Sequence, residues 1–166
     1  MIAKRYLLAS ALVLLGIAGG DVRAASGDGD FHYPLTTARM QAYINAMLNL
    51  GDAACKDPKL AALLDRQSDA NTPTATIIAG YENSPTAKQA FKAAGLTTQE
   101  FVHIGDAYMS AAFGLAYVQQ THGKLNTTVY DAANVEFFKA HQKELDAMLA
   151  KGTKEREAAG TGCNMD

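Results

Sequence analysis

Hydrophobic residues recur at spacings of three and four along most of this chain, which is the spacing of one face of a helix. Near the start of the chain the apolar positions are Met40, Tyr43, Ile44, Met47 and Leu48. Near its end they are Val135, Phe138, Leu145, Met148 and Leu149. This pattern predicts amphipathic helices over about 36–50 and 132–150.

The stretch from Leu96 to Thr121 has an apolar arc that covers most of a helix circumference. With 3.6 residues per turn, one side carries Phe101, Ile104, Tyr108, Ala111, Ala112, Leu115 and Val118. A second side carries Val102, Met109, Phe113 and Ala116. Because both sides need a neighbour, we expect a central helix over about 97–122, ended by Gly123.

Three shorter helices are indicated by a repeated start signal, in which a capping residue precedes a proline at the first helical position. The second of them is rich in β-branched residues, such as Thr76 and Ile77, that also favour strands. No other segment offers a partner strand, so we expect a helix there too. The start signals are Asp57-Pro58, Thr72-Pro73 and Ser84-Pro85, and the predicted helices cover about 58–67, 73–82 and 85–94.

The remaining helix boundaries follow from glycine and capping residues. Gly95 is placed to end the third short helix, and Thr97-x-x-Glu100 forms a capping box that opens the long one. Asp131 is an N-cap for the last helix, and Gly152 is its predicted stop. No internal repeat is present. The sequence therefore predicts an all-α, single-domain helical bundle with three longer and three short helices.

The first residues have the features of a secretory signal peptide. Lys4 and Arg5 precede an apolar stretch over 6–18, and Val22-Arg23-Ala24 is a small-residue cleavage site. The apolar stretch is short for a membrane span, which needs about 20 residues. We expect a periplasmic or extracellular protein without a transmembrane segment after cleavage. The predicted organisation is a signal peptide (1–24), a flexible N-terminus (25–33), the bundle (34–151) and a C-terminal tail (152–166).

The chain contains two cysteines, Cys55 and Cys163. In an exported protein an even number of cysteines indicates disulfides, so we expect these two to form a bridge that ties the tail to the region after the first helix. The alternatives are two free thiols or a bridge between chains. A structural staple is favoured over a redox role.

The charge distribution argues against nucleic acid and anionic membranes as partners. The formal net charge is −2, there is no Trp, and no basic run is interleaved with aromatic residues.

The long helix also carries the polar residues that are best placed for chemistry. Glu100-x-x-His103 has the spacing of di-iron bundles, but the companion motifs on other helices are absent. Ser110, His103 and Asp106 are the residue types of a hydrolytic triad, yet all three lie on one helix without a strained nucleophile turn. We assign no catalytic residue and no cofactor.

A metal or haem site is the main alternative. A single zinc could be held by His103, His141 and Glu144 if the two helices are neighbours. No C-x-x-C-H motif is present, so any haem would be held non-covalently, with Met40 or Met47 opposite His141.

The most distributed signal is a set of methionine and aromatic residues on the predicted apolar faces. Flexible Met beside aromatics can line an adaptable pocket or an interface, although an ordinary core has the same composition. Phe137 and Phe138 are adjacent, so only one can face the core fully. The candidate ligand or interface residues are Met40, Tyr43, Met47, Met109, Phe113, Tyr117, Phe137 and Phe138.

The junction Ala93-Ala94-Gly95-Leu96-Thr97-Thr98-Gln99-Glu100-Phe101 resembles one found in a loose set of small exported all-helical bacterial proteins without characterised activity. The opening of the last helix, residues 133–138, is similar to theirs as well. The resemblance implies an all-helical fold and an exported location, and it implies no catalytic residues.

Together these observations favour an exported helical module that binds a partner protein or a small apolar ligand. The alternatives are a metal- or haem-dependent protein built on His103 and His141, and a structural component of the cell envelope.

Overall fold

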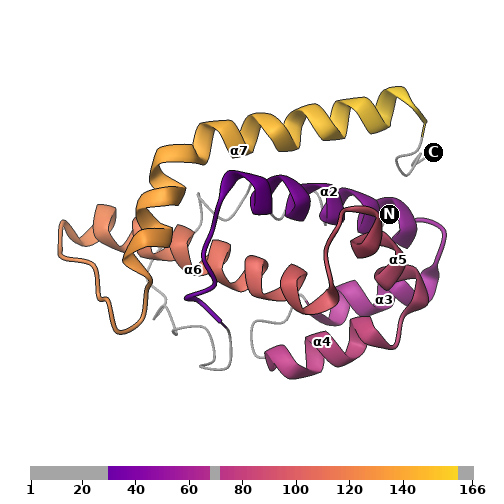
Figure 1. Ribbon diagram of the computed structural model, residues 1–166, viewed down its shortest axis with the longest axis horizontal. Coiled ribbons are helices and arrows are strands. Elements are labelled where there is room, and N and C mark those ends of the chain that lie inside the picture. The colour runs from indigo at the N-terminus through magenta and orange to yellow at the C-terminus, as the bar shows by residue number, and fades with distance from the viewer. Residues whose placement is uncertain (1–29, 68–71, 161–166) are drawn as a thin grey trace.

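The computed structural model describes residues 30–67 and 72–160, and within these ranges all regular secondary structure is helical, as the sequence predicts. The predicted signal peptide, residues 25–29 and Cys163 lie outside the described residues. The helices, labelled in Figure 1, are α2 (Thr37–Ala54), α3 (Pro58–Gln67), α4 (Thr74–Glu82), α5 (Pro85–Ala93), α6 (Thr98–Thr121) and α7 (Ala132–Ala158).

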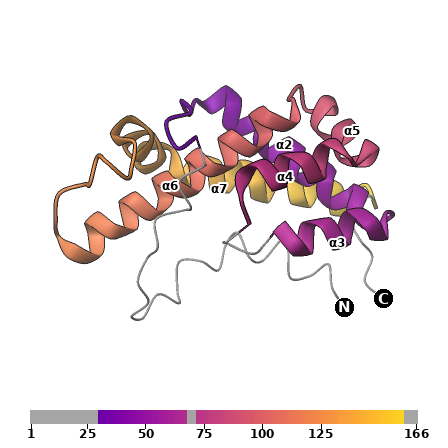
Figure 2. The ribbon, with the colours of Figure 1, turned by 90° about the horizontal axis from the view of Figure 1, so that it is seen from below.

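Helices α2 and α6 share the centre of the bundle. Each of them packs against four other helices, and they pack against one another. Helix α7 runs along one side of α2, while the short helices α3, α4 and α5 gather at the opposite side (Figures 1 and 2). The sequence predicted a central role for α6, and α2 shares it.

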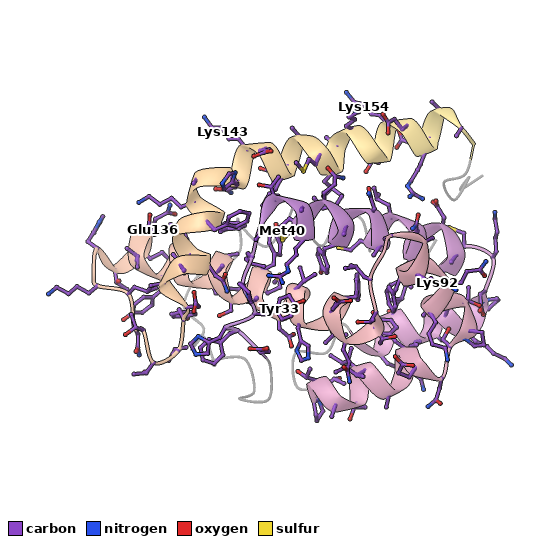
Figure 3. The ribbon with its side chains drawn as sticks, in the orientation of Figure 1. Tyr33, Met40, Lys92, Glu136, Lys143 and Lys154 are labelled. Carbon is purple, nitrogen blue, oxygen red and sulfur yellow. The ribbon has the colours of Figure 1, made fainter. Side chains whose placement is uncertain are left out.

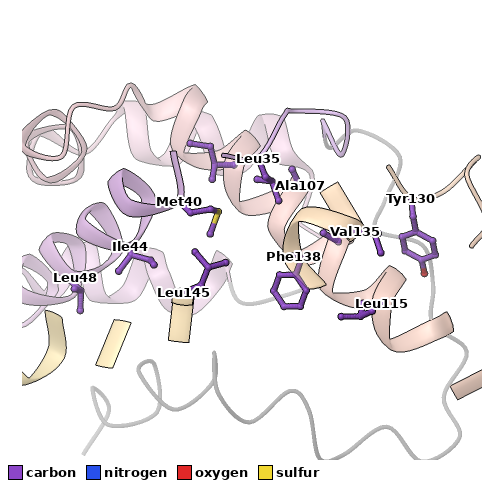
Figure 4. Close-up of a cluster of buried hydrophobic side chains, with 12 residues drawn as sticks. Leu35, Met40, Ile44, Leu48, Ala107, Leu115, Tyr130, Val135, Phe138 and Leu145 are labelled. Carbon is purple, nitrogen blue, oxygen red and sulfur yellow. The ribbon is translucent and has the colours of Figure 1, made fainter. Parts of the chain in front are cut away.

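Two clusters of buried apolar side chains hold these helices together. The first joins α2, α6 and α7 (Figure 4), and includes Met40, Ile44, Ile104, Phe138 and Leu145. The second joins α2, the short helices and the first turns of α6, and includes Leu50, Leu60, Phe91, Phe101 and Val102. Full burial of one large apolar side chain stabilises the folded state by about 1.5–3 kcal/mol. Helix α6 contributes its first turns to the second cluster and its later turns to the first, while Met109 on the predicted second apolar side is exposed.

The predicted capping residues begin most of the helices. The side chains of Asp57, Ser84, Thr97 and Asp131 each accept a backbone N–H bond from the first turn that follows. Thr72 does not cap α4, because its hydroxyl donates to the Arg66 carbonyl at 3.4 Å instead. Pro73 holds the N-cap position of α4 without a side-chain bond. Gly95 follows α5 with φ +78°, as expected of a C′ glycine.

The predicted end of the last helix is wrong, since α7 continues through Gly152 to Ala158. Glycine in a helix interior costs about 1 kcal/mol relative to alanine, which is why it suggested a stop. Here, however, Gly152 faces Leu48 of α2 so closely that a Cβ would lie 2.5 Å from Leu48 Cδ1. One turn later Arg156 pairs with Asp52 and Asn49 of α2. Contact with α2 therefore stabilises the extra turns.

The other two long helices differ less from their predicted bounds. Helix α2 passes its predicted end near residue 50 and continues through Gly51 to Ala54. Helix α6 ends at Thr121, and the left-handed residue after it is His122, with φ 48°, rather than Gly123.

A buried asparagine ties the segment before α2 to the start of α7. The Asn134 side chain accepts a hydrogen bond from Leu35 N at 2.9 Å and donates to the carbonyls of Phe31 and Tyr33, both at 3.0 Å. Nearby, His32 Nδ1 lies 2.9 Å from Asp131 Oδ2. Residues 31–33 are thus bonded to the start of α7.

Across the residues that the structure describes, no helix is long and apolar enough to span a membrane.

Candidate functional site

Helix α6 carries two features that could serve a function, a polar cluster near its start and an exposed apolar surface from its middle onward. Its first turn is structural. Thr97 N donates to Glu100 Oε2 at 2.9 Å, and Glu100 N donates to Thr97 Oγ1 at 3.2 Å. The hydrogen bonds from Thr97 lower the pKa of Glu100 below its ordinary value. Glu100 therefore acts as the predicted capping residue.

His103 lies against the segment that precedes α2. Its ring stacks on Tyr33 with the centroids 6.0 Å apart, and the Arg39 guanidinium lies 4.9 Å from the Tyr33 centroid. The His103 Nδ1 atom is buried, and no side chain or backbone group in the described ranges forms a hydrogen bond with it. This nitrogen is therefore bonded to neither Asp106 nor Ser110, which gives a hydrolytic triad no support.

Asp106 lies one turn after His103, where α6 meets the start of α4. Its Oδ2 atom accepts a hydrogen bond from Thr74 Oγ1 at 3.3 Å. Burial raises the pKa of Asp106 above its ordinary value, while the Thr74 hydrogen bond and His103 act in the opposite direction. The two polar residues thus occupy a half-buried junction of α6, α4 and the N-terminal segment.

His141 is engaged on its own helix. Its Nδ1 atom lies 2.8 Å from Glu144 Oε2, and its ring stacks on Phe137 with the centroids 4.5 Å apart. His103 instead faces Tyr33. Within residues 30–67 and 72–160, no three His, Cys, Asp or Glu side chains are grouped so that they could hold a metal ion. The structure therefore does not assemble His103, His141 and Glu144 into the suggested zinc site.

The suggested haem ligands from α2 belong to the packed interior. Met40 is 1% exposed in the core between α2, α6 and α7, and Met47 packs against both apolar clusters. Both methionines therefore act as core side chains.

Most of the candidate methionine and aromatic residues are also core residues. Phe138 is buried, while Tyr43, Met47, Phe113 and Phe137 are partly buried and pack against the clusters. Burial raises the pKa of Tyr43 well above its ordinary value. Of the adjacent pair Phe137 and Phe138, the second is the one that faces the core.

Met109 and Tyr117 differ from the rest of this set, because they are the large hydrophobic residues that the described chain exposes, at 39% and 40%. Phe113 lies between them, partly buried, and the three residues are four apart. Residues at this spacing share one side of a helix. We call Met109, Phe113 and Tyr117 the α6 stripe.

The α6 stripe is exposed because the short helices do not reach it. Helix α4 contacts the start of α6 through Thr74 and Asp106, and the second half of α6 extends beyond α4 (Figure 2). At the far end the Tyr117 ring lies 6.3 Å from that of Tyr130. Exposed Gln120 follows about one turn after Tyr117 and two turns after Phe113, and exposed Lys124 comes after the helix end.

The outer surface of α7 has a different character. Glu136, Lys143 and Lys154 are exposed there, and their side chains point away from the bundle (Figure 3). A charged surface of this kind is suited to water, so the apolar α6 stripe is the better candidate for an interaction site.

No family model, curated protein or solved structure matches this chain.

The sequence indicated only part of this arrangement. It placed Met109 and Phe113 on a second apolar side of α6. The segments that cover the first turns of that side are distant in the sequence, so the sequence did not show that the later turns are exposed. The bonds of Asn134 were also missed, since a single Asn in an otherwise amphipathic helix start carries no distinctive pattern.

Proposed function

We propose that this protein is an exported helical interaction module that binds a partner protein through the α6 stripe. The observation that supports this function is the exposure of Met109 and Tyr117 on one side of a central helix. Soluble domains bury most such side chains, and contiguous exposed apolar surface is typical of interaction sites. Methionine adapts its shape to a partner, and tyrosine is enriched where binding energy concentrates.

A protein partner fits this surface better than a small apolar ligand does. Small molecules bind in concave sites that enclose most of their surface. The α6 stripe lies along the outside of a helix, and most of the other candidate residues pack within the two apolar clusters. A helix or groove of another protein can contact all three stripe residues at once, because they repeat at helical spacing.

Export belongs to the same proposal and rests on the basic, apolar and small-residue regions of residues 1–24. N-terminal sequencing of protein purified from its own source tests this part. The expected first residue is Ala25, and a chain that retains Lys4 and Arg5 would contradict it.

We also retain the Cys55–Cys163 disulfide as part of the proposal. Arg156 of α7 pairs with Asp52, only three residues before Cys55, and Cys163 follows Arg156 by seven residues. Seven residues can span up to about 25 Å, so the bridge is within reach. Thiol titration of the unfolded, unreduced protein should find no free thiol, whereas two reactive thiols would rule the bridge out.

Site-specific photo-crosslinking in the native source tests the binding site. A photoreactive residue at Met109 or Tyr117 should give a covalent adduct with a discrete protein. The same residue at exposed Ala140 of α7 is the matched control and should not give it. Failure to form adducts at both stripe positions, or an identical adduct at Ala140, would contradict the proposed function.

A further inference from the structure

We infer that the segment before α2 is a strap that closes in mildly acidic solution, because an ion pair between His32 and Asp131 fastens it to the start of α7. We call residues 30–35 the N-terminal strap. Its pH response comes from the histidine, since histidine side chains gain and lose their charge between about pH 5 and 8. None of these residues belongs to the α6 stripe, so the inference is independent of the proposed function.

The N-terminal strap lies against two helices that come much later in the chain (Figure 1). The Asn134 side chain of α7 bonds to Leu35 N and to the carbonyls of Phe31 and Tyr33. The Tyr33 ring stacks on His103 of α6, with the centroids 6.0 Å apart. Leu35 is buried in the first apolar cluster. The Asn134 bonds join uncharged groups, so they do not themselves respond to pH.

His32 adds a contact that does respond to pH. Its Nδ1 atom lies 2.9 Å from Asp131 Oδ2. The other carboxylate oxygen, Asp131 Oδ1, accepts the Asn134 N–H at 2.9 Å and so caps α7. The two side chains attract one another as charges only while the imidazole is protonated. One carboxylate thus connects His32 to the residue whose side chain holds the rest of the strap.

Asp131 keeps its charge over the range in which histidine changes charge. Burial acts to raise the pKa of Asp131, but hydrogen bonds from His32 and from the Asn134 N–H bring this pKa below its ordinary value of 3.8. The attraction is therefore present while the histidine is protonated, and it is lost as the pH rises and the histidine becomes neutral. The strap is consequently held more tightly at about pH 5.5 than at about pH 8.

Other charged groups also lie near the N-terminal strap. Burial and, to a smaller extent, the Asp30 carboxylate raise the pKa of Asp106 of α6. The Arg39 guanidinium of α2 lies 4.9 Å from the centroid of an aromatic ring of the strap, and it stays charged at every pH considered. His103 is a second histidine in contact with the strap. Substitution of His32 and of His103 is therefore needed to assign a pH effect to one of them.

The closed strap leaves one buried polar atom without a hydrogen bond. This atom is His103 Nδ1, which no described group bonds and which lies in the ring that Tyr33 covers. A buried nitrogen without a partner costs free energy, and water can reach it once the strap lifts. This cost favours opening, so loss of the His32 charge acts on a contact that is already opposed.

Amide hydrogen exchange, measured residue by residue by NMR on the purified chain, reports how often the strap opens. Leu35 N donates to Asn134, so its protection factor, corrected for the intrinsic effect of pH on exchange, measures opening. This factor should be about twofold to fivefold larger at about pH 5.5 than at about pH 8, which is the size expected of an exposed ion pair. Leu35 should also be less protected than Ile104 in the core, because the strap opens without global unfolding.

Three substitutions assign the effect. Asp131→Asn removes the charge and keeps a residue that caps helices well, and His32→Gln removes the titrating group. Both should abolish the difference in Leu35 protection between the two pH values. The matched control is His141→Gln, which removes another histidine paired with a carboxylate, that of Glu144, on the same helix α7. This control should retain the difference.

The inference is overturned if Leu35 protection is equal at the two pH values, or larger at the higher one. It is also overturned if the difference persists in His32→Gln and disappears in His103→Gln, because the response then belongs to α6. Equal protection of Leu35 and Ile104 would show that the strap does not open by itself, which contradicts the inference as well.

Discussion

Replacement of Gly114 by alanine should reveal how closely α6 and α7 approach one another. A Cβ at this position would lie 2.8 Å from Val135 Cγ2 and 3.1 Å from Tyr130 Cγ. Both neighbours belong to a packed cluster, and Gly114 itself is buried. Insertion of a methyl group into a well-packed core costs about 1–3 kcal/mol.

The glycine-to-alanine change also has a favourable part, since alanine stabilises a helix by about 0.8–1.0 kcal/mol relative to glycine. Gly51→Ala isolates that part. Gly51 lies within α2, and nothing is within 4 Å of its would-be Cβ. We therefore expect Gly51→Ala to be stabilising by about 1 kcal/mol, and Gly114→Ala to be neutral or destabilising by up to about 2 kcal/mol.

The difference between the two variants, about 1–3 kcal/mol, measures the helix contact. Urea unfolding of each variant gives the free energy of unfolding, and unchanged m values would show that the unfolded states are comparable. If Gly114→Ala is as stabilising as Gly51→Ala, the close approach of α6 to Val135 and Tyr130 is refuted.

Three further predictions follow. Asn134→Ala should reduce the free energy of unfolding by about 2–4 kcal/mol, because buried backbone groups including Leu35 N lose their partner. A loss below about 0.5 kcal/mol, measured by urea unfolding, would contradict the role of the Asn134 hydrogen bonds. Asp106→Asn should stabilise the protein at neutral pH, because the raised pKa of Asp106 means that its ionised form destabilises the fold. The advantage should shrink as the pH falls toward and below the ordinary aspartate pKa of 3.8, because Asp106 then becomes neutral in both the folded and the unfolded state. If the difference in melting temperature between Asp106→Asn and the unsubstituted protein widens as the pH falls, this prediction is contradicted. Arg156→Ala should increase amide hydrogen exchange in the last turns of α7, whereas exposed Lys154→Ala should not, and equal exchange in both variants would contradict the role of the Arg156 pair.

The helices were predictable because most of their signals are local. The capping bonds of Asp57, Ser84 and Thr97 involve residues two or three positions away, so the sequence carries them directly. The buried side of α6, with Ile104, Ala111 and Leu115, follows from the 3.6-residue period alone. These features depend on chain geometry rather than on which helix lies next to which.

The features that sequence reasoning missed depend on distant partners. Helix α7 continues through Gly152, because Leu48 of α2 packs in the space that a larger side chain at this position would occupy. Asn134 bonds to residues about a hundred positions earlier, so nothing near it in the chain indicates its role. His103 and His141 were grouped as metal ligands from residue type, yet His103 stacks on Tyr33 and His141 pairs with Glu144.

The candidate site shows the same division. Periodicity placed Met109 and Phe113 on an apolar side, and it could not show where α4 stops covering that side. Which half of an amphipathic surface remains exposed is decided by the lengths and positions of the neighbouring helices.

Methionine oxidation footprinting tests the central claim, that the α6 stripe is an interface, most directly. Met109 is 39% exposed and Met40 is 1% exposed, so Met40 serves as an internal control for intact folding. In the dilute, purified chain Met109 should oxidise much faster than Met40. When the partner protein is bound, Met109 should become protected while Met40 is unchanged. An oxidation rate of Met109 that is the same in both states would contradict the account.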